Sequence, residues 1–198
     1  MTTSLRIGAA AACGCLLLLS PAAKAQGRTL DQAILDEINF ARTQPAAYAR
    51  AMAKDADRPR TSAADPAAFG EAFDFLRHQR PLPALRFDTA LAGAARSHAV
   101  LQGRDGSIGH TGPGGEKLSE RLHRYGAFAS LMAEDISYGY STPREVVRQL
   151  IVDSDVPDRG HRDNIFNPVL REAGVACGPH PVYRAMCVVD FTSGLMRR

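Results

Sequence analysis

A histidine-bearing polar segment runs directly into an apolar C-terminal end, and this junction constrains the fold more than any other feature of the chain. The segment reads Gly160-His161-Arg162-Asp163-Asn164-Ile165-Phe166-Asn167-Pro168. From Glu172 onward the apolar residues fall into two runs separated by Gly178-Pro179-His180-Pro181, a pattern that predicts a late β-hairpin. A fold for this chain must therefore place a polar segment with a histidine beside two strands.

Helical signals precede this hairpin. Thr29 followed by Gln32 is a capping box for a first helix that ends near residue 42. Thr142-Pro143 with Glu145 is a second capping box, with proline at the first helical position. Residues 55–66 are expected to form an exposed loop. Further helices are expected over residues 45–54, 67–78, 88–102 and 118–125. Several helices and a late hairpin predict an α+β fold.

The first 25 residues predict a cleaved secretory signal peptide. Arg6 supplies the positive n-region, residues 7–19 form an apolar run, and a small-x-small cleavage site ends at Ala25. The apolar run is too short for a permanent transmembrane helix. Cys13 and Cys15 lie inside this segment, which leaves a lipoprotein anchor as the alternative.

The chain that follows, residues 26–198, is close to neutral. The whole sequence has 24 basic and 21 acidic residues. Two of the basic residues, Arg6 and Lys24, lie in the signal peptide, so 22 basic and 21 acidic residues remain. No basic stripe with interleaved aromatic residues is present, which argues against a nucleic-acid partner. The length suits a single domain with one core.

Two cysteines remain after the signal peptide, Cys177 and Cys187. They flank the predicted hairpin turn, so in an oxidising compartment we expect a cross-strand disulfide. Two buried free thiols on neighbouring strands are the alternative. The pair lacks a CxxC spacing and does not indicate a structural zinc site.

Three motifs in a fixed order give the chain a family resemblance. Gly109-His110-Thr111-Gly112 comes first, Ala133-Glu134-Asp135-Ile136 second, and the segment that begins at Gly160 third. Together they resemble the CAP superfamily, which includes cysteine-rich secretory proteins, insect venom allergens and plant pathogenesis-related proteins, and most of all its bacterial SCP-type domains. The resemblance implies a three-layer α-β-α sandwich, in which helices cover both faces of a central antiparallel sheet.

The resemblance also implies a cleft that binds a divalent cation. In the family the matching histidines line a central cleft with acidic residues, and in some members they bind zinc or another divalent ion. Carried onto this chain, the implied ligands are His110, His161 and Glu134, with Asp153 as the second carboxylate. Two imidazoles and a carboxylate suit Zn²⁺ and leave a coordination position for water. The alternative is a hydrogen-bonded polar cluster in which Glu134 orients an imidazole and nothing reacts.

Two acidic positions depart from the family pattern. Asp153 matches loosely, because Leu150 stands where a tryptophan is common, and Glu120 is the alternative for the second carboxylate. Asp135 stands where most members have asparagine. If it and Glu134 are both buried, the pKa of one of them should rise. A further histidine, on the apolar face of its helix, is expected in the core or at the cleft edge: His98.

The resemblance leaves three classes of function open. We expect a secreted or periplasmic binding module, a monomer without a transmembrane anchor, that takes a lipid, small-molecule or protein partner. The alternative is a metal-dependent hydrolase, in which the metal activates water and Glu134 is the catalytic group. The third class is a sterol- or lipid-binding protein. The sequence contains neither GxSxG nor HExxH, which argues against a serine hydrolase and a zincin-type protease.

Overall fold

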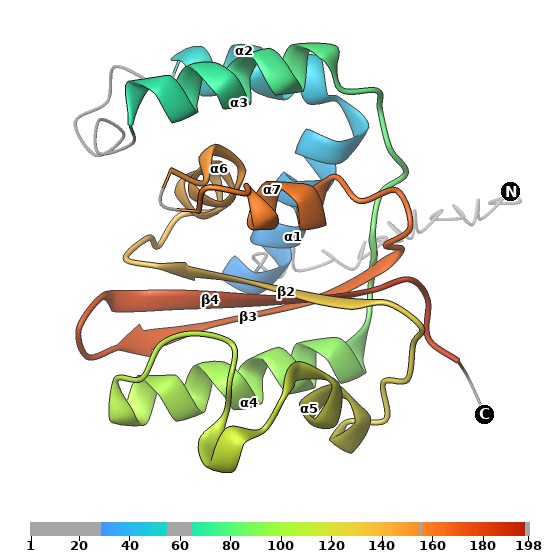
Figure 1. Cartoon of the computed structure of the whole chain (residues 1–198), viewed down its shortest axis with the longest axis vertical. Helices are drawn as coiled ribbons and strands as arrows, with labels where there is room; N and C mark the ends of the chain where they lie inside the picture. Colours follow the sequence, from blue (N-terminus) through green and yellow to red (C-terminus); the bar gives the residue numbers. More distant parts are fainter. Residues whose placement is uncertain (1–28, 55–64, 155, 197–198) are drawn as a thin grey trace, which may run out of the picture.

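The computed structural model describes residues 29–54, 65–154 and 156–196 (Figure 1). The predicted signal peptide and most of the predicted loop 55–66 lie outside the described residues. No helix within the described ranges is long and apolar enough to cross a membrane. The elements in chain order are α1 (Leu30–Thr43), α2 (Pro45–Lys54), α3 (Pro66–His78), β1 (Arg86–Phe87), α4 (Thr89–Asp105), a 3-10 turn (Pro113–Gly115), α5 (Leu118–Arg124), β2 (Met132–Tyr138), α6 (Pro143–Val152), α7 (Gly160–Ile165), β3 (Glu172–His180) and β4 (Arg184–Thr192).

A four-stranded sheet separates two helical layers (Figure 1). Its strand order is β1-β3-β4-β2, so β2 is an edge strand. Helices α1, α6 and α7 lie on one side of the sheet with α2 and α3 outside them, and α4 and α5 lie on the other side. The predicted α-β-α sandwich is confirmed. The sheet is antiparallel apart from β1, which pairs with β3 in parallel over two residues.

The predicted late hairpin is present as β3 and β4, and it forms the middle of the sheet. Alternate residues of the two strands enter different cores, because successive strand residues point to opposite faces. Val175 and Val189 pack in the core beneath α1 and α6, whereas Val188 packs in the core on the α4 side. Cys177 lies opposite Cys187 and the two form a disulfide with a Cα–Cα distance of 4.0 Å, which confirms the predicted bond.

Helix α4 runs further than the sequence predicts, through residue 105 instead of 102. Gly103, which the predicted helix boundary at residue 102 leaves outside the helix, is helical. A Cβ at Gly103 would lie 2.6 Å from the carbonyl oxygen of Pro179. Helix α4 ends at Gly106, whose left-handed backbone (φ 74°) forms the cap. Gly103 therefore allows α4 to pack closely against β3, and Gly106 ends the helix.

Two elements, β2 and α7, have no distinct signal of their own in the sequence. The acidic pair Glu134-Asp135 interrupts the apolar alternation of β2, so no strand pattern is visible there. Helix α7 has only six residues and begins after Arg159, which lies in the left-handed region and offers no side-chain cap. Both elements carry residues of the candidate site.

Helix α4 approaches the sheet closely at Gly174 of β3. A Cβ at this position would lie 2.0 Å from the backbone nitrogen of Ala92 and 2.3 Å from the carbonyl carbon of Leu91, both in the first turn of α4. Backbone atoms cannot move aside without displacing the helix, whose start is fixed by hydrogen bonds from Ala90 and Leu91 to the Asp88 carboxylate.

We expect Gly174→Ala to lower the free energy of unfolding by about 3 kcal/mol or more, because the new methyl group must push α4 away from the sheet. Gly178→Ala in the same strand is the matched control, since a Cβ there meets nothing within 4 Å. Urea denaturation of the two variants measures the difference. Equal stability of the two variants would contradict the close approach of α4 to β3.

Candidate functional site

The three sequence motifs meet at β2, the edge strand of the sheet. Glu134 and Asp135 are consecutive residues of β2 and therefore point to opposite faces. Glu134 faces the α5 side, where it contacts Arg121 and His110. Asp135 faces the α7 side, where Asn164 donates a hydrogen bond to it. The site is thus built around the edge of the sheet, with one histidine supplied from each helical layer.

His110 is held by Glu134. Its Nδ1 lies 2.9 Å from Oε1 of Glu134, and the fully buried Arg121 donates from its guanidinium to the other carboxylate oxygen. Burial raises the pKa of Glu134, but the hydrogen bond with His110 and the charge of Arg121 outweigh burial, so that pKa lies below its ordinary value. Both oxygens of this carboxylate are therefore engaged in the ionised state.

The loop that carries His110 is anchored through Gly109. Its N–H donates to the Tyr138 hydroxyl at 3.0 Å, and its carbonyl accepts from the amide of Gln102 at 2.6 Å. Nε2 of His98 lies 2.9 Å from the same carbonyl oxygen. His98 is fully buried, as expected from its place on the apolar face of α4, and burial lowers its pKa. Two buried side chains of α4 and the half-buried Tyr138 of β2 thus fix the backbone beside His110.

His161 is held by Asp153 in a similar way. Nδ1 of His161 lies 2.7 Å from Oδ1 of Asp153, and the His161 N–H donates to Oδ2 at 2.9 Å. Asp153 ends α6 in the left-handed region (φ 55°), which turns its side chain toward α7. Burial lowers the pKa of His161, but the hydrogen bond and charge of Asp153 outweigh burial and raise that pKa above 6.5.

The two imidazoles face each other with ring centroids 6.5 Å apart. The side chain of His110 is 54% exposed and that of His161 is 17% exposed, so His110 is the ring with freedom to move. Each Nδ1 is engaged by a carboxylate, and neither Nε2 forms a hydrogen bond within the described residues. The same residues contain no group of three or more His, Cys, Asp or Glu side chains close enough to hold a metal ion.

Asp135 is a buried acid between α7 and the sheet. Asn164 donates to its Oδ1 at 2.8 Å, while its Oδ2 has no hydrogen-bond partner. Burial raises the pKa of Asp135 to about 8, and the charges of Asp153 and Glu134 add to this rise. The sequence predicts a raised pKa for one member of the Glu134-Asp135 pair, and the raised member is Asp135. The remaining alternative from the sequence, Glu120, accepts a hydrogen bond from the N–H of Lys117 at the start of α5.

Sequence reasoning missed two residues of this site. Arg121 reads as a solvated charge on a short helix, yet it is fully buried. Asp190 lies in an apolar strand pattern directly across from Glu134. Burial and the charge of Glu134 raise the pKa of Asp190 well above its ordinary value. Neither residue belongs to a motif: the register of β2 against β4 places Asp190 at the site, and the packing of α5 against β2 places Arg121 there.

The sequence matches a known protein family. The family model described as the cysteine-rich secretory protein family, CAP, matches residues 70–191, which is more than half of the chain. This chain belongs to the CAP family. The matched range contains all three motifs and both histidines of the site. No curated protein matches the chain.

Solved structures that resemble this CAP domain come from bacteria. An outer surface protein from Borrelia burgdorferi is 24% identical with a TM-score of 0.48, and the match covers 56% of this chain and 77% of that one. An extracellular protein containing a SCP domain from Bacillus anthracis is 24% identical with a TM-score of 0.48, over 64% of this chain and 39% of that one. A cysteine-rich secretory protein from Staphylococcus aureus is 16% identical with a TM-score of 0.40, over 65% and 38%. The chain thus spans less than half the length of the last two proteins.

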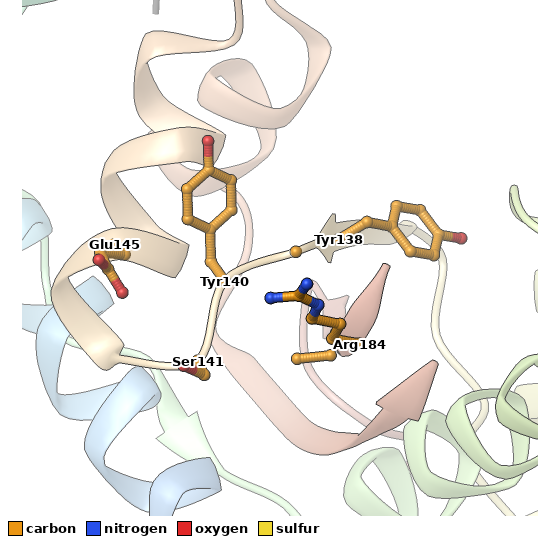
Figure 2. A pocket seen from close by; sticks show the side chains of 7 residues that line it. Tyr138, Tyr140, Ser141, Glu145 and Arg184 are labelled. Carbon is orange, nitrogen blue, oxygen red and sulfur yellow. The ribbon is translucent and has the colours of Figure 1, made fainter. Parts of the chain in front are cut away.

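Pockets of this CAP domain also carry charged residues. One of about 580 Å³ lies where β2 ends and β4 begins. Figure 2 shows that the guanidinium of Arg184 points toward Tyr140 across this pocket, with Glu145 on the opposite wall. A smaller one of about 170 Å³ lies beside the His110 loop and is lined in part by His98 and Gln102. Neither lining is the continuous apolar surface that a sterol site needs.

The buried Asp135 makes the stability of the CAP domain depend on pH. Folded Asp135 keeps its proton up to a pH of about 8, whereas its ordinary pKa is 3.8. Unfolding between these values releases a proton, so the contribution of Asp135 to stability is present below pH 4 and is lost as the pH rises toward 8.

We therefore expect Asp135→Asn to become more stable relative to the wild type by about 4 kcal/mol between pH 5 and pH 8, because asparagine cannot ionise. Asn164 can still donate to the amide oxygen. Denaturant unfolding of both proteins across this pH range measures the change. A difference in stability that is independent of pH would show that Asp135 does not titrate as described.

Proposed function

We propose that this CAP domain is an extracytoplasmic binding module whose paired histidines, His110 and His161, bind a divalent transition-metal ion such as Zn²⁺. The observation that carries the proposal is the shared arrangement of the two rings. Each Nδ1 is held by a buried carboxylate, which fixes the tautomer. The lone pair of Nε2 is then the one that can bind a metal ion. Zinc-binding histidines in proteins commonly have this arrangement of carboxylate, imidazole and metal.

The donor set fits a weak site. Neutral imidazole is a preferred ligand of Zn²⁺, with a metal–nitrogen bond of about 2 Å. The observed ring separation of 6.5 Å is larger than one tetrahedral ion would allow, so the half-exposed His110 must approach His161. Glu134 and Asp153 then act by orienting the rings, and water or a ligand group completes the coordination. When bound, the metal supplies an electrophilic centre for an anionic or carbonyl group of that ligand.

An extracytoplasmic location is supported by the disulfide. Disulfides persist in oxidising compartments and are rare in the cytosol. Cys177 and Cys187 join the two central strands, so the bond lies within the core structure. The N-terminal signal peptide predicted from the sequence fits the same location.

The hydrolase alternative receives less support. It requires Glu134 to exchange a proton with substrate or with metal-bound water. Both carboxylate oxygens of Glu134 are instead occupied, one by His110 and one by Arg121. A binding role therefore accounts for the arrangement better than catalysis by this carboxylate.

We expect zinc titrated into the purified protein at pH 8 to bind with one-to-one stoichiometry, and His110→Ala/His161→Ala to abolish this binding in isothermal titration calorimetry. Glu134→Gln should weaken binding by about 10–100-fold, since it disturbs the group that orients His110. His78→Ala is the matched control, because His78 is an exposed histidine on α3 away from the pair.

Zinc binding should also weaken as the pH falls from 8 to 5. The pKa of His161 is raised above 6.5, so protons compete for the ring at a higher pH than at an ordinary histidine. Titrations at several pH values measure this dependence. Zinc binding that survives the double substitution, or that His78→Ala removes, would overturn the proposed function.

A further inference from the structure

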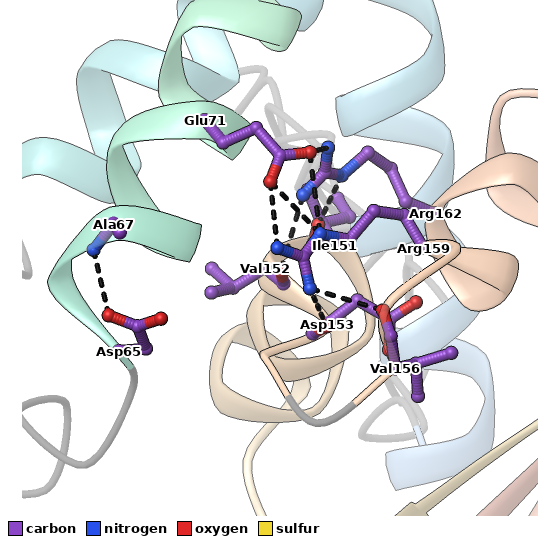
Figure 3. Close-up of polar contacts among 9 residues, drawn as sticks. All are labelled: Asp65, Ala67, Glu71, Ile151, Val152, Asp153, Val156, Arg159 and Arg162. Atoms are coloured by element: carbon purple, nitrogen blue, oxygen red, sulfur yellow. Dashed lines mark hydrogen bonds and ion pairs between the residues drawn. The ribbon is translucent and has the colours of Figure 1, made fainter.

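A second polar cluster joins α3 to the chain segment that carries His161. It consists of Glu71 on α3 together with Arg159 and Arg162, which flank His161 in the sequence. Figure 3 shows that both guanidinium groups converge on the single carboxylate of Glu71. None of the three residues belongs to the site described above.

Glu71 binds both arginines at once. Arg159 donates from Nε to Oε2 at 3.0 Å and from its terminal nitrogen to the same oxygen at 2.8 Å, while Arg162 donates to Oε1 at 2.8 Å. These hydrogen bonds lower the pKa of Glu71 to about 2, so it is a carboxylate at any working pH. An exposed ion pair usually contributes little to stability. A carboxylate shared by two partly buried guanidinium groups, however, fixes the positions of both groups.

The two arginines also donate hydrogen bonds to the backbone at the end of α6. Arg162 donates to the carbonyl oxygens of Ile151 at 2.6 Å and Val152 at 3.2 Å, and Arg159 donates to the carbonyl oxygen of Asp153 at 2.7 Å. The last carbonyl groups of a helix have no partner within the helix, so they need donors from elsewhere. Here the two arginines provide these donors, as the dashed lines in Figure 3 show.

The backbone at this point is unfavourable on its own. Asp153 and Arg159 both lie in the left-handed region, each with φ 55°, a conformation that a non-glycine residue keeps only when its surroundings impose it. Asp153 is the residue that holds the ring and the N–H of His161. The contacts of Glu71 are therefore connected to the orientation of His161 through the arginines and the backbone of Asp153.

We infer that Glu71 is a positioning residue for the paired histidines: it holds Arg159 and Arg162 so that Asp153 can fix His161. The inference rests on the proposed function in that His161 is taken as a metal ligand. It assigns a role at the site to α3, a helix of the outer layer that supplies none of the family motifs. Without the Glu71 carboxylate, the two guanidinium groups would lose the one acidic side chain to which both donate hydrogen bonds among the described residues.

The test measures the hydrogen bond between the His161 N–H and Asp153 directly, in the purified metal-free protein. In Glu71→Gln, we expect amide hydrogen exchange at His161 to speed up by roughly tenfold or more, as for the loss of a charge-assisted contact. The Gly109 amide, bonded to the Tyr138 hydroxyl on the His110 side, should exchange at the wild-type rate. Arg159→Lys keeps the charge but loses the planar guanidinium group. It should therefore also speed up exchange at His161 and leave exchange at Gly109 unchanged.

Asp74→Asn is the matched control on the same helix. It also removes one negative charge, but the Asp74 side chain is exposed and, among the described residues, forms an ion pair with its neighbour Arg77 at 4.0 Å. Exchange at His161 should stay unchanged in this variant. The inference is overturned if His161 exchange is the same in Glu71→Gln as in Asp74→Asn, or if the Gly109 amide accelerates equally, which would indicate general loosening.

Zinc titration separates this inference from the proposed function. If the wild type binds zinc, Glu71→Gln should weaken binding by about tenfold and Asp74→Asn should not. Equal zinc affinity of the two variants would overturn the positioning role. If the wild type binds no zinc, the proposed function fails, while the exchange rates at His161 and Gly109 still decide whether Glu71 positions the ring.

Discussion

The pairing of β3 with β4 is the interaction on which the rest of this structure depends. Their nine-residue register forms the middle of the sheet, and each outer strand adds to one of them. Because successive residues alternate in direction, the hairpin supplies apolar side chains to both helical layers at once. The disulfide joins the hairpin near its turn, and Gly174 allows α4 to approach its backbone. β2 then takes its place as an edge strand by pairing with β4.

That edge position creates the site. An edge strand has one side without a neighbouring strand, so residues from the two helical layers can meet around it. Glu134 points to one layer and Asp135 to the other, and the histidines approach from the same two directions. The buried charge of Glu134 needs a partner, which explains why a buried arginine, Arg121, lies against it. The polar cluster around Glu134 and Asp135 therefore forms because both acids lie in the edge strand of the sheet.

The two histidines depend on different kinds of support. The backbone beside His110 is anchored by neutral groups, namely the Gln102 amide and the Tyr138 hydroxyl. His161 depends on a charged network that ends at Glu71 on an outer helix. His110 is a half-exposed ring on a glycine-bounded loop, whereas the His161 ring is held by the buried Asp153, so one partner can move and the other stays in place.

The sequence by itself determined the local features of this protein: the capped helices α1 and α6, the late hairpin with its cysteine pair, and the motifs that carry His110, Glu134 and His161. Local hydrogen bonds, turn residues and apolar periodicity set these features, and all of them lie within short stretches of the chain. Only the tertiary structure decided which residues support the histidines, including Arg121, Asp190 and Glu71. Strand register and helix packing bring these residues to the site from distant positions, and a charged residue that becomes buried carries no local signal that distinguishes it from a solvated one.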